Sequence, residues 1–382
     1  MQRLAILGAT GSIGRQTLQL VDEFPQEFEV IGLTTRGNIE ILQQQIFKYK
    51  PEFAVVVDEE KAGLLSSRLN NTGTEILAGE QSLEALVTDS SVDLVVNGLV
   101  GFSGFKPTLT AVKNDKKIAL ANKEALVAGG ELITAEAEKR NLPLLPIDSE
   151  HSAIFQCFHA GERREVKKLV LTASGGPFKD FTEEELQNVT PAQALKHPTW
   201  KMGAKITVDS ATLMNKGFEI IEAHWLFKVD YDLIEVVIHP QSIVHSMVEF
   251  IDSSIIAQMG NPDMFLPIQY ALSYPERWQS SLPSFDFNST YNLQFSPPSF
   301  ELFPCLDFAY QAGRTGGTMP AVLSAADEVA VEKFLQGSIY FPDIPKILES
   351  VMGRHSLKIN PGLNDIIDAD NWAREEVERV LS

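Results

Sequence analysis

Short apolar runs alternate with helical patterns from residue 1 to about residue 148, and this alternation constrains the fold more than any other feature. Candidate strands lie at 3–8, 28–34, 53–57, 93–97, 117–121 and 144–147. Candidate helices lie near 12–23, 38–48, 59–69, 80–88 and 124–139. Such alternation is typical of a mostly parallel sheet with helices on both faces. The sequence therefore predicts an N-terminal Rossmann-like, doubly wound α/β domain, whose binding residues gather at the carboxyl ends of its strands.

The first strand runs directly into a glycine-rich turn. Gly8, Gly11 and Gly14 form a GxxGxxG variant of the dinucleotide-binding fingerprint. Glycine at these positions permits a tight turn, close approach of the backbone to a pyrophosphate, and close packing of helix on sheet. Many strand-to-helix turns use glycine for geometry alone. Here the motif follows a strand, begins a helix and starts a βα series, so we expect a nucleotide site.

The turn after the second strand indicates which nucleotide. The acidic residue that commonly binds an adenosine ribose is missing there, and the chain reads Thr34-Thr35-Arg36-Gly37-Asn38 instead. A guanidinium with neighbouring hydroxyls and an amide suits a 2′-phosphate, which favours NADP over NAD. An ordinary polar turn before a helix is the alternative.

Charge and cysteine content exclude several classes of function. The formal net charge of -19 argues against nonspecific binding to nucleic acid or to anionic membranes, so a phosphate site must be a local positive island. Two cysteines, Cys157 and Cys305, cannot form a disulfide framework. No apolar run reaches the length of a membrane span, and the first strand begins too close to Met1 for a leader peptide. We therefore expect a cytoplasmic protein.

The length of 382 residues predicts more than one domain. After the N-terminal domain, 1–148, a central α/β region covers 149–279 with strands expected at 166–172, 205–209, 233–238, 243–250 and 254–258. Residues 280–304 are rich in Ser, Pro and Asn and read as a linker. Residues 305–382 have helical patterns and predict a C-terminal α-helical bundle.

Acidic residues follow the last strand of the N-terminal domain. Asp148 and Glu150 lie two positions apart, so an extended backbone would point both to one side. With Glu219 they offer three oxygen ligands, the preference of a hard cation such as Mg²⁺ or Mn²⁺. The alternative is that Asp148 and Ser149 merely cap the helix that follows.

The segment 207–222, TVDSATLMNKGFEIIE, collects polar groups at the expected opening of one helix. Ser210, Asn215 and Lys216 suit an anionic ligand there, because free N–H groups and the helix dipole favour phosphate. Asn215 and Glu219 are spaced i, i+4 and share one face. A capped surface helix in water is the alternative.

Two loops add candidate binding residues. Ser174 precedes two glycines after a strand, an arrangement that suits a small anion nest or a plain turn. Residues 197–203, HPTWKMG, combine a breaker with an indole and a thioether, which predicts a lid that closes over a ligand. Core packing of Trp200 and Met202 is the alternative, and His197 alone does not establish an acid or a base.

Taken together, the motifs resemble one family. The strings GATGSIG, ALANKEALVAGG, PIDSEHSAIFQC, TASGGPF, HPTWKMG, VDSATLMNKGFEIIEAHWLF, HPQSIVHSMVEF and PAVLSAADEVAVE look like the 1-deoxy-D-xylulose 5-phosphate reductoisomerase family, in order from residue 4 to about 334. The resemblance implies an NADPH-binding domain, a catalytic domain, a linker and a helical bundle in a homodimer. It also implies an NADP-dependent oxidoreductase that isomerises 1-deoxy-D-xylulose 5-phosphate and reduces it to 2-C-methyl-D-erythritol 4-phosphate, in non-mevalonate isoprenoid precursor biosynthesis.

The resemblance assigns roles to individual residues. It implies that Asp148, Glu150 and Glu219 bind Mg²⁺, Mn²⁺ or Co²⁺, and that Lys123, Glu150 and His197 are catalytic. The implied substrate contacts are Lys123, Ser149, Glu150, Ser174, His197, Ser210, Asn215, Lys216 and Glu219. The implied NADPH contacts are Thr10, Gly11, Ser12, Ile13, Arg36, Gly37, Asn38, Asn122, Glu124 and Gly203. The sequence departs from the family at Arg36-Gly37, often a glycine followed by a basic or small residue, at Asp327, usually Asn, and at Phe265, often Arg.

Two other functions remain as alternatives. One is an NADP-dependent semialdehyde-type dehydrogenase with Cys157 as covalent nucleophile. Cys157 lies in an apolar helical pattern, which favours a buried, inert thiol. The other is a non-catalytic NADP-binding protein, which has no use for the acidic residues.

Overall fold

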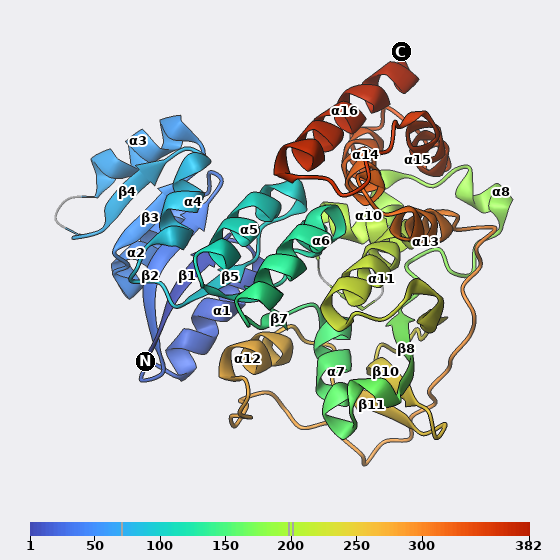
Figure 1. Cartoon of the computed structure of the whole chain (residues 1–382), viewed down its shortest axis with the longest axis horizontal. Helices are drawn as coiled ribbons and strands as arrows, with labels where there is room; N and C mark the ends of the chain where they lie inside the picture. The colour runs from blue at the N-terminus through green and yellow to red at the C-terminus, as the bar shows by residue number, and fades with distance from the viewer. Residues whose placement is uncertain (70–71, 198, 201) are drawn as a thin grey trace. The chain divides into compact units, whose positions relative to one another are not determined.

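The computed structural model describes the chain except for residues 70, 71, 198 and 201 (Figure 1). The chain forms two compact units. Unit 1 comprises Met1–Ala125, Leu132–Asp148 and Asp263–Leu282, and unit 2 comprises Leu126–Glu131, Ser149–Pro262 and Pro283–Ser382. Residues 263–279, which we expected in the central domain, group with unit 1. The four-part division by function stays a prediction.

Unit 1 is built on a parallel sheet with the strand order β4-β3-β2-β1-β5-β6-β7. From β1, the strands β2 to β4 extend the sheet to one side and β5 to β7 extend it to the other. The connecting helices of the two halves therefore cover opposite faces of the sheet. The strands are β1 (Gln2–Leu7), β2 (Phe28–Thr35), β3 (Phe53–Val56), β4 (Glu75–Ala78), β5 (Leu94–Asn97), β6 (Lys117–Leu120) and β7 (Leu144–Pro146). The predicted doubly wound sheet is therefore confirmed.

The connecting helices of this sheet follow most of the predicted ranges. They are α1 (Ser12–Glu23), α2 (Ile39–Tyr49), α3 (Glu59–Arg68), α4 (Gln81–Thr88), η1 (Gly101–Gly104), α5 (Phe105–Lys113), α6 (Lys123–Lys139) and α12 (Phe265–Ser273). We did not predict β4 or α5. Strand β4 lies at the sheet edge with no fully buried residue, so it lacks the apolar run that marks the inner strands.

Unit 2 contains a mixed sheet with the order β11-β10-β8-β9. Its strands are β8 (Val166–Ala173), β9 (Ile234–Ile238), β10 (Val244–Phe250) and β11 (Ile255–Met259). The helices before and beside the sheet are α7 (Ser149–Cys157), η2 (Phe158–Ala160), η3 (Arg163–Glu165), α8 (Glu183–Leu186), α9 (Pro191–Ala194), α10 (Ala204–Thr212), α11 (Met214–Phe227) and η4 (Tyr231–Leu233). The C-terminal helices are α13 (Cys305–Thr315), α14 (Met319–Leu335), α15 (Asp343–Arg354) and α16 (Leu363–Leu381), so the predicted bundle is confirmed.

The strand predicted at 205–209 is wrong, because these residues belong to α10. The β-branched run Ile206-Thr207-Val208 suggested a strand. In the helix, the Thr207 hydroxyl donates to the Gly203 carbonyl over 2.7 Å, so the side chain is satisfied without a sheet. Local propensity is overridden here by burial of Val208 in the core of unit 2.

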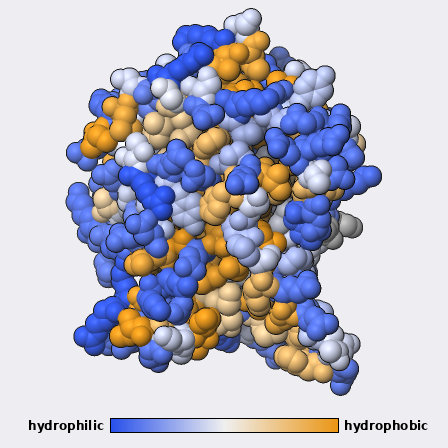
Figure 2. All heavy atoms as spheres, turned by 90° about the vertical axis from the view of Figure 1, so that its right-hand side faces the viewer, coloured by the Kyte–Doolittle hydropathy of each residue, from blue (hydrophilic) through white to orange (hydrophobic). Residues whose placement is uncertain are grey.

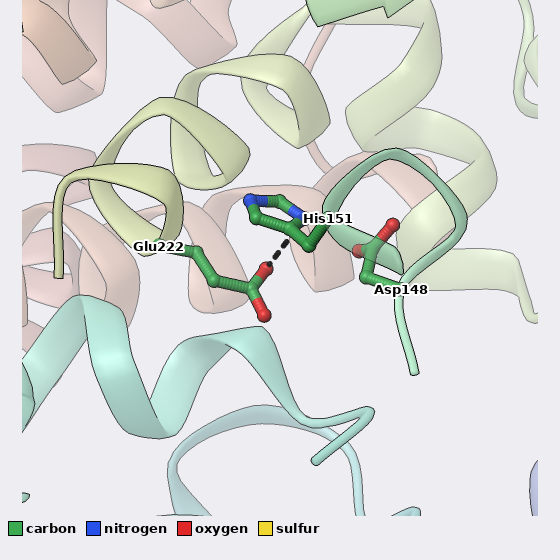
Figure 3. A group of neighbouring side chains, drawn as sticks. All are labelled: Asp148, His151 and Glu222. Carbon is green, nitrogen blue, oxygen red and sulfur yellow. Dashed lines mark ion pairs between the residues drawn. The ribbon is translucent and has the colours of Figure 1, made fainter. Parts of the chain in front are cut away.

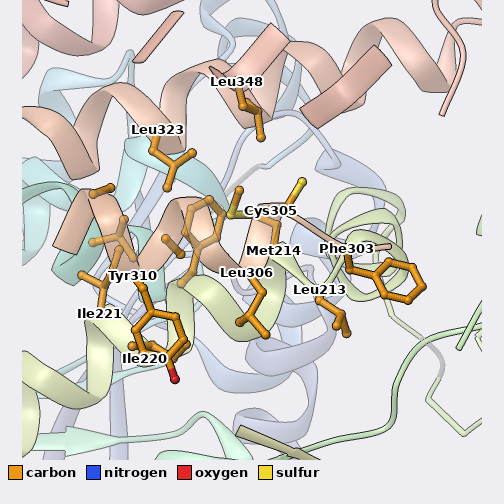
Figure 4. Close-up of a cluster of buried hydrophobic side chains, with 14 of the residues drawn as sticks. Leu213, Met214, Ile220, Ile221, Phe303, Cys305, Leu306, Tyr310, Leu323 and Leu348 are labelled. Atoms are coloured by element: carbon orange, nitrogen blue, oxygen red, sulfur yellow. The ribbon is translucent and has the colours of Figure 1, made fainter. Parts of the chain in front are cut away.

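Apolar side chains of helix α11 form part of the hydrophobic core of unit 2 (Figure 4). Met214, Ile220 and Ile221 are buried among side chains of α13 and α14. A β-carbon at Gly217 would lie 2.5 Å from the β-carbon of Ala309, so α11 and α13 approach closely there. This close packing sets the position of α11, the helix that also contains Asn215, Lys216 and Glu219.

Asp327, the departure in α14, belongs to a buried cluster. The ammonium of Lys205 lies 2.6 Å from Asp209 and 2.8 Å from Asp327. The cluster links the start of α10 to α14 within unit 2. Phe265, the other departure, begins α12 and is buried.

The predicted linker contains an irregular segment that pairs with unit 2 through an isolated bridge between Ile238 and Ser296. Figure 2 shows one face of the molecule, on which hydrophilic residues predominate and hydrophobic ones gather mainly in the lower half. Among the described residues, every helix is too short or too polar to cross a bilayer.

Candidate active site

The glycine-rich turn of unit 1 has the backbone that the motif predicts. Gly8 has φ +80°, and a β-carbon on it would lie 2.7 Å from the carbonyl oxygen of Gly98. A β-carbon on Gly14 would lie 2.4 Å from Cα of Ala9, so only glycine lets α1 pack this closely. Gly11 is the N-cap of α1 and has no side chain to occupy the first N–H groups. The first turn of α1, with Ser12 and Ile13, is thus suited to bind a phosphate.

The neighbouring strand end is hydrogen-bonded to this turn. The hydroxyls of Thr10 and Thr35 lie 2.8 Å apart, and the Gly8 N–H donates to the Thr34 hydroxyl over 2.9 Å. Arg36 follows with an exposed side chain, and Asn38 caps α2 by accepting from the Ile41 N–H. The predicted residues of β1 and β2 therefore lie at one edge of the sheet, around the turn.

Asn122 and Lys123 begin α6 at the same edge of the sheet. The Asn122 side chain caps the helix by accepting from the Ala125 N–H, and its amide donates to Glu124 over 2.9 Å. Lys123 is buried, and its ammonium lies 2.5 Å from Oδ2 of Asp148, the residue after β7. Unit 1 therefore holds a lysine against one of the predicted metal ligands.

Unit 2 brings the other acidic residues together through α7 and α11. The ammonium of Lys216 contacts Oε1 of Glu150 over 2.9 Å and also contacts Oε2 of Glu219. The amide of Asn215 donates to Glu219 over 2.6 Å, and the hydroxyl of Ser149 donates to Glu150 over 2.6 Å. Lys216 is only 3% exposed, so these ion pairs are shielded from water.

The geometry of the carboxylates fits a divalent cation. One oxygen from each of Asp148, Glu150 and Glu219 lies within 4.8 Å of the others. Oxygens that share one ion at about 2.0–2.6 Å are at most about 4–5 Å apart. We expected an extended backbone at this point, but α7 begins at Ser149, and Glu150 stands in its first turn.

A second group of side chains lies beside the first and was not predicted. His151 and Glu222 are both fully buried, with Nδ1 of His151 3.4 Å from Oε2 of Glu222 (Figure 3). Nε2 of His151 lies 2.9 Å from the carbonyl oxygen of Glu219, so His151 supports the backbone that carries a predicted ligand. Asp148, His151 and Glu222 could also hold an ion. The sequence shows that Glu222 lies three positions after Glu219, on the same face of a helix. No sequence pattern pairs Glu222 with His151.

His197, Ser174 and Ser210 form a polar cluster in unit 2. Nε2 of His197 lies 3.0 Å from the Ser174 hydroxyl and 3.1 Å from the Ser210 hydroxyl. Nδ1 accepts from the N–H groups of Thr199 and Trp200, at 3.2 and 2.9 Å, so Nδ1 carries no proton and Nε2 is the donor. Burial lowers the pKa of His197, which favours this neutral tautomer.

The predicted single helix over 207–222 is wrong, because α10 and α11 are separate. Leu213 joins them with φ +62°, the left-handed region, which turns the chain sharply. Ser210 therefore stands at the end of α10, while Asn215 and Lys216 stand in the first turn of α11. A β-carbon on Gly176 would lie 2.5 Å from the Ser210 carbonyl oxygen, so glycine lets the Ser174 turn lie against α10.

The predicted lid falls partly outside the described residues, since Pro198 and Lys201 are not described. Trp200 and Met202 are half-buried, and Gly203 is the N-cap of α10. The lid function stays a prediction.

Cys157 does not have the environment of a nucleophile. It is buried in the core of unit 2, and burial raises its pKa to about 11. A nucleophilic cysteine needs a lowered pKa and access to substrate. The alternative of a covalent dehydrogenase therefore receives no support from the structure.

Family models match most of the chain. A 1-deoxy-D-xylulose 5-phosphate reductoisomerase model matches residues 4–130, and two models of the C-terminal domain of this enzyme match 144–227 and 259–376. The reductoisomerase of Desulforamulus reducens is 51% identical over 100% of this chain and 99% of the relative. That of Heliobacterium modesticaldum is 52% identical over 100% and 98%.

Solved structures agree over the full length. The reductoisomerase from Zymomonas mobilis in complex with NADPH has a TM-score of 0.93 and 39% identity, covering 100% of this chain and 99% of its own. A reductoisomerase in complex with NADPH, fosmidomycin and magnesium has a TM-score of 0.93 and 38% identity, covering 100% and 98%. The chain described here therefore belongs to the 1-deoxy-D-xylulose 5-phosphate reductoisomerase family.

Proposed function

We propose that this chain is an NADPH- and divalent-metal-dependent oxidoreductase that isomerises 1-deoxy-D-xylulose 5-phosphate and reduces it to 2-C-methyl-D-erythritol 4-phosphate, a step in non-mevalonate isoprenoid precursor biosynthesis. Membership of the family, at about 50% identity over the whole chain, supports this function. The observation that assigns this function to particular residues is a set of contacts in unit 2. Lys216 contacts Glu150, and Asn215 contacts Glu219.

Asp148, Glu150 and Glu219 are the proposed ligands of Mg²⁺ or Mn²⁺, with Co²⁺ as a further candidate. Their acidic oxygens suit a hard cation, and Lys123 and Lys216 limit the repulsion among them. When bound, the ion supplies Lewis-acid polarisation of the ketone and hydroxyl oxygens of the substrate, and NADPH supplies the hydride.

Lys123, Glu150 and His197 are the proposed catalytic residues. The ammonium of Lys123, next to Asp148, orients the sugar oxygens and steadies negative charge that develops on them. Glu150 is oriented by the Ser149 hydroxyl and by Lys216, so its carboxylate has a fixed position. Removing either oriented charge should raise the barrier to the reaction.

The substrate phosphate is assigned to the Ser174, His197 and Ser210 cluster, with Asn215 and Lys216 completing the contacts. The neutral His197 donates from Nε2, and the two hydroxyls can donate once the phosphate accepts. Binding energy from the phosphate positions the reacting carbons, and the 197–203 loop excludes water.

The NADPH site is assigned to the carboxyl edge of the unit 1 sheet. The first turn of α1 binds the pyrophosphate through Thr10, Gly11, Ser12 and Ile13. The other assigned contacts are Arg36, Gly37, Asn38, Asn122, Glu124 and Gly203.

The direct test is the oxidation of NADPH, followed at 340 nm, with 1-deoxy-D-xylulose 5-phosphate after removal of metal and readdition of Mg²⁺ or Mn²⁺. We expect turnover only with the ion and the sugar phosphate present. Glu150→Gln should abolish turnover while NADPH affinity stays unchanged. Full activity of this variant under stringent metal removal would refute the role of Glu150.

A homodimer is proposed through the edge strand β11. Ile255 is 55% exposed, and Ile256 and Met259 are 39% and 41% exposed. An exposed apolar edge strand offers unpaired backbone groups to a second strand, and a second copy of this chain is the proposed partner. Light scattering after size exclusion should give twice the chain mass, and Ile255→Lys should give monomers. A monomeric wild type, or a dimer unaffected by the variant, contradicts the proposal.

The cytoplasm is proposed as the place of action. The support is that Cys157 and Cys305 are free and buried, as expected in a reducing compartment.

A further inference from the structure

The side chain of Lys61 lies across the backbone of Gly37. A β-carbon built on Gly37 would meet Nζ of Lys61 at 2.9 Å and its Cδ at 3.1 Å. Lys61 belongs to the first turn of α3, far from Gly37 in the sequence. The lysine therefore occupies the space that a side chain at position 37 would take.

Backbone pairing of two strand ends holds this contact in place. Strands β2 and β3 are parallel neighbours, and beyond them the Asp58 N–H donates to the Arg36 carbonyl over 2.9 Å. Asp58 then caps α3 by accepting from the Lys61 N–H over 3.1 Å. Lys61, in the first turn of α3, and the exposed Arg36, in the turn after β2, thus follow the carboxyl ends of two neighbouring strands.

We propose that Lys61 is a specificity-determining residue for NADPH, acting with Arg36 as a second cation for the ribose 2′-phosphate. The inference rests on the proposed binding of NADPH to unit 1. In folds of this kind, the end of β2 binds the adenosine ribose, and a 2′-phosphate requires positive charge there. Lys61 has three N–H donors, and its ion pair with Asp58 is long, at 3.5 Å, so the ammonium can also bind a phosphate.

The glycine at 37 is explained by the same contact. Because Gly37 has no side chain, Lys61 of α3 can lie over the loop at Gly37. The basic group at this loop then comes from α3 and not from position 37. The φ of Gly37 lies outside the left-handed region, so alanine is compatible with the backbone. An alanine there displaces the flexible end of Lys61 instead of straining the loop.

The experiment measures dissociation constants of NADPH and NADH for the full chain, by fluorescence titration at low and moderate salt. For Lys61→Gln we expect NADPH to bind about fivefold to tenfold more weakly, with a weaker salt dependence, and NADH to bind as before. Lys61→Arg should keep the wild-type preference. Lys48→Gln is the matched control, because Lys48 is also an exposed lysine paired with an aspartate, Asp22, on the neighbouring helix α2.

Two further variants act on the same lysine in opposite directions. Gly37→Ala should weaken NADPH binding, and this loss should vanish when Lys61 is already Gln. Asp58→Asn keeps a good N-cap but removes the competing negative charge, so NADPH should bind more tightly and NADH should be unaffected.

An unchanged NADPH constant in Lys61→Gln, or equal weakening of both cofactors, overturns the proposal while leaving the proposed function intact. Additive losses in Gly37→Ala and Lys61→Gln also overturn it. A wild-type chain that binds neither cofactor overturns the proposed function and this inference together.

Discussion

The ammonium of Lys216 lies 2.9 Å from Oε1 of Glu150 and thereby joins the first turn of α11 to the first turn of α7. The same ammonium contacts Glu219. A buried cation thus stands among carboxylates that are assigned to a metal ion. Its position suggests that the lysine stabilises the site and also competes with the ion for the oxygens.

Lys216→Gln should separate these two effects. Turnover should fall about 100-fold, because a charge-assisted contact to the substrate is lost. Mn²⁺ should bind the free variant about threefold to tenfold more tightly, because a competing positive charge is removed. Calorimetric titration with Mn²⁺ and steady-state kinetics check both. Lys167→Gln, which removes a surface partner of Glu249, is the control, and weaker Mn²⁺ binding in the Lys216 variant contradicts the account.

His197→Ala should raise the KM for the sugar phosphate about 10-fold to 100-fold, because the Nε2 donor and the alignment of both serines are lost. The NADPH dissociation constant should not change.

Because burial lowers the pKa of His197, kcat/KM should show no loss from its protonation until the pH falls well below 6.5. A fall in wild-type kcat/KM that begins at or above pH 6.5 and is absent in His197→Ala would contradict the neutral form of His197.

His245 should make the fold sensitive to acid. It is buried on β10, and burial lowers its pKa to about 4, while hydrogen bonds with the backbone of Asn261 and Gly260 act in the opposite direction. The unfolded chain takes up this proton first, so stability is lost as the pH falls below about 6.5. Between pH 7 and pH 5 the loss is about 2 kcal/mol. Urea unfolding of wild type and His245→Gln at both pH values checks this, and an equal decline in both proteins would remove His245 as the cause.

Cys157 should be inert. With a pKa of about 11 and a buried position, it should react with a disulfide reagent at pH 8 only on unfolding. Cys157→Ala should retain activity, with a modest loss of stability from the cavity. Rapid labelling of native protein at Cys157, with parallel loss of turnover, would restore the dehydrogenase alternative.

Most of the fold was predictable because the inner strands of a parallel sheet are apolar on both faces. Strand β4 escaped prediction because it lies at the edge, half-exposed. The helix α10 was mistaken for a strand because Thr207 and Val208 favour strands locally, whereas its hydroxyl bond and the core favour a helix. Local sequence patterns reflect the conformational preference of an isolated segment. Burial in the folded chain decides whether that segment forms a helix or a strand.

The site was predictable in its residues but less in its geometry. Nothing in the spacing of Glu150 and Glu219 shows that they meet, and the resemblance to a family supplied that expectation. The turn at Leu213 that separates Ser210 from Asn215 has no sequence signal, since a non-glycine residue takes the left-handed conformation. The contacts of His151 with Glu222, and of Lys61 with Gly37, depend on which elements become neighbours.

The binding of Mn²⁺ to the free chain tests the central claim most directly. Calorimetry or electron paramagnetic resonance should give one site per chain in the wild type. Asp148→Asn, Glu150→Gln and Glu219→Gln should each weaken it about 10-fold to 100-fold with NADPH affinity unchanged. Glu222→Gln should leave Mn²⁺ binding nearly intact, because Glu222 pairs with His151. Wild-type affinity for Mn²⁺ in Glu219→Gln, or loss of the site only in Glu222→Gln, would contradict the assignment.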